Sequence, residues 1–350
     1  MSSEAPPPFR ERMLGLLEPS QLMAMAISLG WVSAFMTRLW KFDFDLLACE
    51  PCILRLICIV FSTTLTEIGI DYMRVCVEAV KRGEVLAPIT QTAKIRDEAF
   101  ARFWIAFSTA RTAAPAPNAP ETSTTTEAEG PELVGSAALI PPLLRTASGV
   151  VLDIGPGTGS QMHLLRSPAI TSIYGAEPCV GLHAELRARA AAEGLEAKYH
   201  VLSCGAASSE LLPALEATGT GIVDAHNRDR SGVFDTILCV RVLCSVPQME
   251  RTTRELYALL KPGGRLLVTE HVVNPWRTAK GSFLARAAQA IYMMFGWRYF
   301  IGDCCMDRDT EGALRRAADQ DGGWESAQLE RSFGWSALPY ISGVLVKKTQ

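Results

Sequence analysis

The sequence predicts an α/β protein with a Rossmann-like, doubly wound and mostly parallel sheet that ends in an antiparallel strand, preceded by an apolar helical N-terminal region. Two observations support this fold class. From Gly149 onward, short apolar strand-like segments alternate with helix-like segments, which favours a parallel sheet with helices on both faces. A loop with three glycines follows the first strand-like segment directly. The 350 residues are enough to bury a sizeable core.

The expected elements follow one another in a regular order. The predicted parallel strands lie at 150–154, 172–177, 198–203, 235–240 and 265–270. The predicted helices begin at about residue 160 and then lie at 183–193, 208–217 and 250–260. A turn at Lys261–Gly264 ends the last of these helices, and a final strand at 340–346 is expected to be antiparallel.

Composition limits the kinds of partner. The net charge is −3 and no basic run of five or more residues occurs, so electrostatics give no reason to expect a nucleic-acid partner. Ten cysteines, several within apolar runs like that around Cys239, suit a reducing, intracellular compartment. Cys49 and Cys52 form one Cys-x-x-Cys pair, but no second pair with zinc spacing accompanies it, so no metal site is predicted.

The N-terminal region, residues 1–93, leaves three interpretations open. The nineteen positions from Pro19 to Thr37 carry no charge, slightly fewer than the roughly 20 residues that a spanning helix needs. A second apolar run, Leu56–Thr66, is shorter still. The region could be a membrane anchor, a hairpin lying in one leaflet, or a soluble helical cap. The expected location is therefore a membrane surface such as the endoplasmic reticulum, with the cytoplasm as the alternative.

Two segments connect this region to the domain at 149–350. Residues 94–112 have helical spacing, with an aromatic stripe of Phe100, Phe103, Trp104 and Phe107. Such stripes mostly pack in a core, but this one could also line a substrate pocket. Residues 113–148 are expected to be a flexible linker and lead-in, because their first part, 113–130, has no large apolar side chain to bury.

The glycine loop indicates a nucleoside-containing ligand. Gly155, Gly157 and Gly159 permit positive φ and close approach of a ligand to the backbone, and ligands of this fold bind beyond the carboxyl ends of the strands. The Gly-x-Gly-x-Gly spacing differs from the dinucleotide fingerprint, and no Lys-Ser/Thr follows as in a P-loop. Asp153 lies two residues before Gly155, and this order is the pattern of class I methyltransferases that use S-adenosylmethionine. Alternatively, Asp153 caps a turn that the glycines merely make tight.

Further residues complete the predicted cofactor site. Glu177 ends the second strand, where a carboxylate can accept hydrogen bonds from both ribose hydroxyls, as it also does in NAD enzymes. Gly205 and Ala206 follow the third strand at the place that usually neighbours adenine, and no acid follows them until Glu210. Val240, at the end of the fourth strand, belongs to the same predicted set. The cofactor is therefore expected to be S-adenosyl-L-methionine.

Residues 149–275 resemble class I S-adenosylmethionine-dependent methyltransferases of the methyltransferase type 11 kind. Three stretches are similar to the membrane-associated alkyl-thiol S-methyltransferases: Leu243–Val246, Glu270–Val272, and Cys304 with Arg308. The departures are the linker at 113–130, the longer N-terminal region and Pro156 in the glycine loop. The resemblance implies methyl transfer to a small lipophilic acceptor, a thiol. An N-, O- or C-methyltransferase that tailors a secondary metabolite and a non-catalytic cofactor-binding scaffold are the alternatives.

Catalytic candidates lie after the fourth and fifth strands: Arg241, Cys244, Ser245, Glu270 and His271. Methyl transfer is an in-line displacement, so the protein mainly orients the acceptor and excludes water. A thiol needs less help from a base than an alcohol, because its pKa is near 8.5. His271 is the predicted catalytic residue, since an imidazole can accept a proton near neutral pH; alternatively it only shapes the pocket. Cys244 is expected to pack.

Overall fold

The structure is a computed structural model that describes residues 52–113, 135–223, 232–294 and 296–349. The chain divides into two compact units, residues 1–96 and 97–350. The predictions for Pro19–Thr37 and Cys49, and nearly all of the linker predicted at 113–130, lie outside the described residues.

The first unit is helical where it is described. Helix α2 spans Cys52–Lys81 and includes the apolar run Leu56–Thr66, α3 spans Ala87–Thr90, and α4 spans Thr92–Ala113 and continues into the second unit. Among the helices of the described residues, none combines the length and the apolar character needed to cross a membrane.

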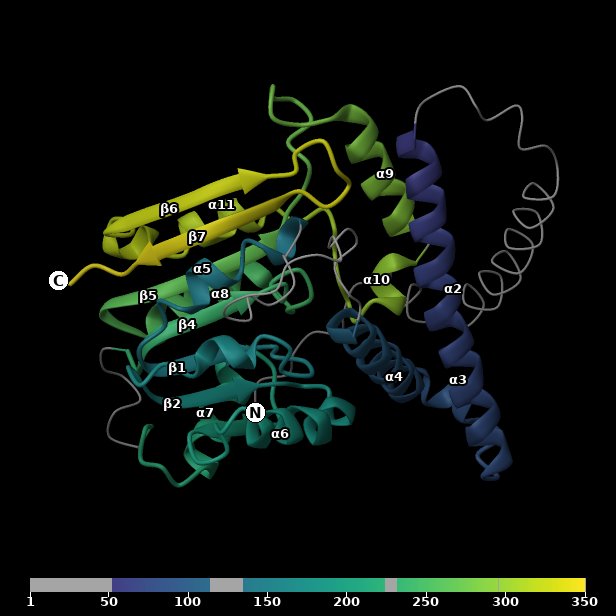
Figure 1. Cartoon of the computed structure of the whole chain (residues 1–350), viewed down its shortest axis with the longest axis horizontal. Helices are drawn as coiled ribbons and strands as arrows, with labels where there is room; N and C mark the ends of the chain where they lie inside the picture. Colours follow the sequence, from purple (N-terminus) through teal and green to yellow (C-terminus); the bar gives the residue numbers. More distant parts are fainter. Residues whose placement is uncertain (1–51, 114–134, 224–231, 295, 350) are drawn as a thin grey trace, which may run out of the picture. The chain divides into compact units, whose positions relative to one another are not determined.

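The second unit is built on a seven-stranded sheet in the order β3-β2-β1-β4-β5-β7-β6 (Figure 1). The strands are β1 Gly149–Ile154, β2 Ile170–Ala176, β3 Tyr199–Leu202, β4 Phe234–Val240, β5 Leu260–His271, β6 Ser326–Ser332 and β7 Tyr340–Val346. The first five strands are parallel, β7 is antiparallel to β5, and β6 is antiparallel to β7. The predicted fold class is confirmed. The sheet ends in two antiparallel strands, not one.

Helices cover both faces of this sheet, as in a doubly wound fold. After α4, the helices of the unit are α5 Pro141–Leu144, α6 His183–Ala192, α7 Ser208–Ala217, α8 Met249–Leu259, α9 Phe283–Met294, α10 Trp297–Phe300 and α11 Thr310–Arg316, with short 3₁₀ helices at Gly135–Ala137, Met162–Leu165, Val180–Leu182 and Asp319–Asp321. One core joins the sheet to α7, α8 and α11 through residues such as Leu211, Leu256 and Leu314, all fully buried. A second core joins the other face to α5 and α6 through Leu144 and Leu186.

Two local predictions differ from the structure. The helix expected from about residue 160 is only the 3₁₀ helix Met162–Leu165. Pro168 follows closely and disfavours α-helical geometry in the residue before it, which explains the short helix. The turn predicted at Lys261–Gly264 lies within β5, where the pairing with β4 shifts register between Phe234 and Thr236.

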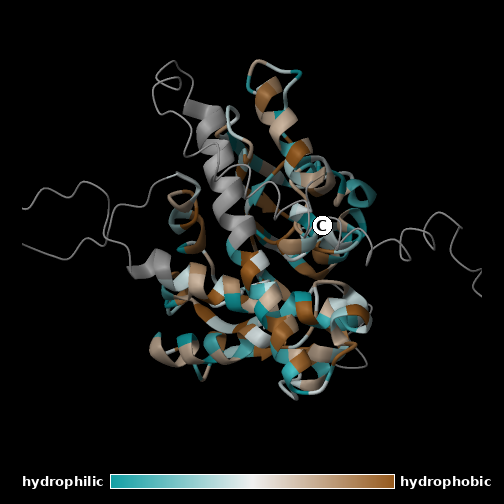
Figure 2. Cartoon of the chain, turned by 90° about the vertical axis from the view of Figure 1, so that its right-hand side faces the viewer, coloured by the Kyte–Doolittle hydropathy of each residue, from teal (hydrophilic) through white to brown (hydrophobic). Residues whose placement is uncertain are grey.

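Helix α9 has one buried and one exposed apolar face. Ala285, Ala288 and Gln289 are buried, whereas Phe283 and Met294 are exposed. Figure 2 colours each residue of the chain by its hydropathy. Such a face is unusual for a surface helix, because the outer side normally carries polar residues.

Candidate active site

The chain leaves β1 through the glycine loop with three left-handed residues. Gly155, Gly157 and Gly159 have φ values of +59°, +60° and +72°, which only glycine adopts without strain. A β-carbon on Gly157 would lie 2.8 Å from Nε1 of Trp104, and one on Gly155 would collide with the Val242 side chain. The loop therefore has no room for side chains at these positions, because Trp104 and Val242 lie close to its backbone.

Helix α4 places its aromatic stripe over this loop. Trp104 lies against Gly157 and stacks on Phe100, with ring centroids 5.7 Å apart. The far side of Phe100 packs against Gly302, where a β-carbon would lie 3.0 Å from its ring. Two aromatic rings therefore connect the glycine loop to the turn before Cys304. Sequence spacing revealed the stripe, but it could not reveal which loop the stripe covers.

Glu177 follows β2 and holds the glycine loop. Its side chain is buried, with Oε2 accepting a hydrogen bond from Gly157 N at 2.9 Å and Oε1 accepting one from Cys179 N at 2.8 Å. Burial raises the pKa of Glu177, while these two backbone N–H groups favour the charged form. Each carboxylate oxygen has two lone pairs, so each keeps the capacity to accept a further hydrogen bond, as from a ribose hydroxyl.

Asp153 lies near the end of β1 and contacts a partner that the sequence did not suggest. The Tyr199 hydroxyl on β3 donates to Oδ2 of Asp153 at 2.9 Å. Burial raises the pKa of Asp153 to about 6, although this hydrogen bond acts in the opposite direction. The two carboxyl groups, Asp153 and Glu177, thus lie on adjacent strands beside the glycine loop.

The remaining predicted cofactor residues, Gly205, Ala206 and Val240, follow the third and end the fourth strand. Gly205 N donates to Oε2 of Glu210 at 2.8 Å, so the first acid after β3 folds back onto the loop. Ala206 is buried in the sheet core, and Val240 ends β4 half-buried.

The loop after β4 is held by Glu270 of β5. Oε1 of Glu270 accepts hydrogen bonds from Val242 N at 2.8 Å and Leu243 N at 3.0 Å, while Oε2 has no partner in the described part of the chain. Arg241 begins this loop with φ +58°, a rare value for a non-glycine residue. Its Nη2 donates to Ser136 Oγ at 2.8 Å and its guanidinium lies 5.7 Å from the ring centre of Tyr340.

His271 ends β5 beside two cysteines. Its Nε2 lies 3.2 Å from Sγ of Cys304, and the side-chain donor atoms of Cys244, His271 and Cys304 all lie within 4.8 Å of one another. All three side chains are buried. The indole Nε1 of Trp297 donates to the same Cys304 sulfur at 3.3 Å. The structure therefore brings Cys304 together with Cys244 and His271, two of the candidates that the sequence places after the fourth and fifth strands.

Arg308 fixes the segment that carries Cys304 to the loop that carries Cys244. Its Nη1 lies 2.7 Å from the carbonyl oxygens of Leu243 and Val246. The backbone N–H of Cys305 donates to the Cys244 carbonyl at 2.9 Å. These contacts hold the two cysteines in place without any contribution from the thiols.

An open pocket of about 410 Å³ adjoins this cluster. Its lining includes Val272, Pro339, Tyr340 and Trp335, together with the turn at 279–282. The Tyr340 ring also contacts His271 edge-on, with ring centroids 6.2 Å apart. The pocket therefore offers apolar and aromatic surface next to the end of β5.

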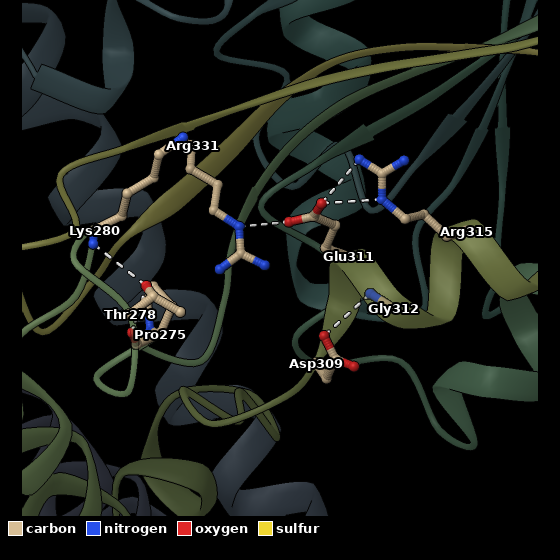
Figure 3. Close-up of polar contacts among 8 residues, drawn as sticks. All are labelled: Pro275, Thr278, Lys280, Asp309, Glu311, Gly312, Arg315 and Arg331. Atoms are coloured by element: carbon tan, nitrogen blue, oxygen red, sulfur yellow. Dashed lines mark hydrogen bonds and ion pairs between the residues drawn. The ribbon is translucent and has the colours of Figure 1, made fainter.

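Two charged residues, Lys280 and Arg331, line this pocket, and Figure 3 shows their polar neighbours. Glu311 of α11 accepts hydrogen bonds from Arg331 Nε at 2.6 Å and from Arg315 Nε at 3.0 Å. Lys280 lies on the facing turn, which closes through the Thr278 hydroxyl donating to the Pro275 carbonyl at 2.9 Å. Arg331 is thus held by an ion pair while its stem lines the pocket.

Replacement of Glu270 by glutamine is expected to flatten the pH dependence of stability. Burial raises the pKa of Glu270 to about 7 from a usual value of 4.5. Because the folded state holds the proton more tightly, this contribution is fully present below pH 4.5 and is lost as the pH rises to about 7. The loss is on the order of 3 kcal/mol. Glutamine stays neutral and keeps an oxygen for the Val242 and Leu243 N–H groups.

Chemical denaturation from pH 4.5 to 8 measures this effect. The exposed Glu196→Gln variant is the control and should follow the wild-type curve. Asp153 also titrates within this window, so the Glu270→Gln curve should be flatter but not level. Identical slopes for wild type and Glu270→Gln would show that Glu270 is ionised in the folded protein.

Comparison with known proteins identifies the family. A family model described as a methyltransferase domain matches residues 133–322. The chain therefore belongs to this methyltransferase family, and its sheet order and glycine loop are those of a class I S-adenosylmethionine-dependent methyltransferase. The bare, closely approached loop and the carboxylate of Glu177 beside it fit that cofactor.

Individual relatives match only part of the chain. Human thiol S-methyltransferase TMT1B is 31% identical over 120 residues, which are 33% of this chain and 45% of the relative. Human thiol S-methyltransferase TMT1A is 29% identical over 120 residues, with the same coverage. The chain thus spans less than half the length of the curated relatives that it matches.

Solved structures resemble the chain more distantly. The S-adenosylmethionine-dependent methyltransferase SibL is 19% identical, with a TM-score of 0.37 over 60% of this chain and 55% of that chain. A putative O-methyltransferase from Nostoc punctiforme is 16% identical, with a TM-score of 0.39 and the same coverage. The fold assignment rests on the sheet of this chain and on the family match.

Proposed function

We propose that this protein transfers the methyl group of S-adenosylmethionine to the sulfur of a small lipophilic thiol inside the cell. The observation that carries the proposal is the buried cluster of Cys244, His271 and Cys304 at the carboxyl ends of β4 and β5. Ligands of doubly wound folds bind at this edge of the sheet. The partial likeness to proteins named thiol S-methyltransferases supports the same acceptor.

The cofactor-binding residues are proposed to act through the glycine loop and the ends of the strands. Gly155, Gly157 and Gly159 present bare backbone, while Glu177 accepts the ribose hydroxyls and holds the loop. The proposed set also includes Asp153, Gly205, Ala206 and Val240. The bound cofactor supplies an activated methyl on a sulfonium. Trp104 covers the loop and excludes water from it, which favours methyl transfer over side reactions.

The acceptor is proposed to enter through the pocket beside β5. Its lining of Val272, Pro339, Tyr340 and Trp335 suits an apolar molecule. His271 is the proposed catalytic residue, because it contacts both Cys304 and Tyr340, which lines that pocket. The imidazole of His271 can promote formation of the acceptor thiolate in one of two ways. It accepts the proton of the thiol, or it holds an ion that lowers the pKa of the thiol.

The test of this function is methyl transfer to a panel of acceptors. Cofactor labelled on the methyl group is incubated with the full chain and with alkyl thiols, phenols and amines of similar size. Label is expected in thioethers alone, identified by mass spectrometry. Label in an amine or phenol, with thiols unmodified, would show that the acceptor is not a thiol. Cofactor binding without transfer to any of them would favour a scaffold.

Replacement of His271 by glutamine is expected to lower turnover by about 100-fold, the usual contribution of a group that manages a proton. Affinity for the cofactor should stay unchanged, because the contacts of the glycine loop do not involve His271. The exposed His163→Gln variant is the control and should retain wild-type turnover. Equal turnover in wild type and His271→Gln would remove His271 from the mechanism.

The N-terminal region, residues 1–93, is proposed to associate with a membrane surface. The exposed apolar residues Phe283, Leu284 and Met294 on α9 support this proposal from the catalytic unit, because such side chains favour the bilayer interface. Alkaline carbonate extraction of membranes separates an integral anchor from a cap or a peripheral contact. Release of the full chain into the soluble fraction would contradict an integral anchor.

A further inference from the structure

We propose that Cys244, His271 and Cys304 bind one zinc ion and leave its fourth coordination position open for the sulfur of the acceptor. The ion site itself is inferred from geometry and donor chemistry alone. The role given to its open position rests on the proposed function, because it assumes that the acceptor is a thiol. The cluster lies outside the glycine loop and combines side chains from three separate segments of the chain.

The three donor atoms already lie close to the positions that a zinc ion requires. Zinc binds sulfur at about 2.3 Å and nitrogen at about 2.0–2.1 Å with tetrahedral angles, so ligand atoms lie roughly 3.5–3.8 Å apart. Nε2 of His271 lies 3.2 Å from Sγ of Cys304, and the widest separation within the group is at most 4.8 Å. Shifts of about 1 Å or less in side-chain torsions would bring all three donors into contact with one ion.

The donor set indicates which ion it prefers and how it would be used. Two thiols and one imidazole are soft and borderline ligands, which favour zinc over magnesium or calcium. Four protein ligands are typical of structural zinc sites, whereas three ligands and one open position are typical of catalytic sites. Within the described residues, no fourth histidine, cysteine or carboxylate joins this group. The set is therefore that of a catalytic site.

The surrounding structure fixes the ligands independently of any ion. Cys305 N donates to the Cys244 carbonyl, and Arg308 holds the carbonyls of Leu243 and Val246. Asp303, the residue before Cys304, adopts φ +62°, so the turn that presents this cysteine is strained. Metal sites depend on ligands that are positioned in advance by their surroundings, and these contacts have that effect.

The groups that surround the three ligands also fit a metal thiolate. Trp297 Nε1 donates to the Cys304 sulfur at 3.3 Å, a contact that strengthens when the sulfur carries negative charge. Two thiolates balance the charge of a divalent ion, so the buried site would be neutral as a whole. His271 Nδ1 is buried without a hydrogen-bond partner in the described part of the chain.

The open position gives the acceptor a direct route to its reactive form. A thiol that coordinates the ion releases its proton to solvent and binds as a thiolate. Its sulfur lone pair then forms the new bond to the methyl carbon while the bond between that carbon and the sulfonium sulfur breaks, and that electron pair stays on the cofactor sulfur. The thioether product is neutral and a weaker ligand, so it leaves the ion. No oxidant or further reactant is needed.

Cobalt titration of the full chain tests the site by its absorption spectrum, without relying on activity. The chain is purified under reducing conditions, stripped of metal and titrated with Co²⁺. Wild type should bind one equivalent, with thiolate charge-transfer absorption and the visible bands of tetrahedral cobalt. Cys244→Ser and Cys304→Ser should lose at least 10-fold in affinity and much of the charge-transfer intensity. Cys305→Ser is the matched control, since this neighbouring buried cysteine is outside the group, and it should match wild type.

Addition of a small alkyl thiol to the cobalt-loaded chain tests the open position. We expect the visible bands to shift and the charge-transfer intensity to rise, and an alcohol of the same length to leave the spectrum unchanged. Failure of wild type to bind cobalt or zinc overturns the inference, as does a Cys244–Cys304 disulfide in freshly reduced protein, detected by mass. Thiol methylation by the metal-free chain would overturn it while the proposed function stands. Metal binding without any methylation of thiols would support the ion site and contradict the proposed function.

Discussion

Gly157→Ala is expected to reduce the affinity for S-adenosylmethionine by about 100-fold, equivalent to roughly 3 kcal/mol of binding free energy. Gly157 has φ +60°, and a β-carbon there would lie 2.8 Å from Nε1 of Trp104. The added methyl must therefore displace either the indole or the loop. Displacement of the loop would also move the backbone N–H that donates to Glu177, so both sides of the proposed ribose and methionine site change together.

Gly219→Ala provides a matched control for this substitution. Gly219 has φ +66°, and a β-carbon there would meet no heavy atom within 4 Å. Both variants carry the same strain of a left-handed alanine, about 1 kcal/mol of folding stability. Only Gly157→Ala should lose cofactor affinity in calorimetric titration. Equal affinities in the two variants would mean that the cofactor does not lie along this loop.

Gln289→Leu is expected to cost about 3–5 kcal/mol of folding stability, among the largest effects of a single substitution. Gln289 lies on α9 and is fully buried. Its Oε1 accepts from Asn274 N at 2.9 Å, and its Nε2 lies 3.0 Å from the carbonyl oxygens of Val272, Met306 and Ala337. Leucine fills a similar volume but leaves these buried backbone groups without their partner.

The consequences of Gln289→Leu should extend to the candidate site. Val272 follows His271 and Met306 lies two residues after Cys304, so Gln289 joins the two segments that carry the cluster. We expect a lower midpoint in urea and a matching loss of cobalt affinity. Gln320→Leu, at an exposed position, is the control and should change neither. Wild-type stability in Gln289→Leu would show that water replaces the lost amide.

Local patterns in the sequence were sufficient for the parallel part of the sheet. The apolar runs before Gly155 and Glu177 have strand length, and the glycine spacing identifies the loop, because both signals lie within a few residues. Strand β6 was missed because it is an edge strand, Ser326–Ser332, with alternating partial exposure and charged residues instead of an apolar run. Edge strands commonly carry such residues, which prevent pairing with other chains.

Sequence patterns could not predict which distant segments contact one another. Cys244 and His271 were named together because both follow predicted parallel strands, whose carboxyl ends lie at one edge of a sheet. Nothing local placed Trp104 on Gly157 or Tyr199 on Asp153, because these contacts depend on how helix and strand pack in three dimensions. Cys304 joins the cluster only through the helical insertion after β5. The expectation that Cys244 merely packs came from its apolar neighbours, which do not reveal the two other donors.

The central claim is that Glu177 and the glycine loop hold S-adenosylmethionine. Calorimetric titration of the full chain with this cofactor, compared with the Glu177→Gln and Glu177→Lys variants, measures it most directly. Wild type should bind one equivalent, the amide should bind more weakly, and the charge reversal should give no measurable heat while its circular dichroism stays that of a folded protein. Wild-type affinity in the charge-reversed variant, or no binding by the wild type, would contradict the claim.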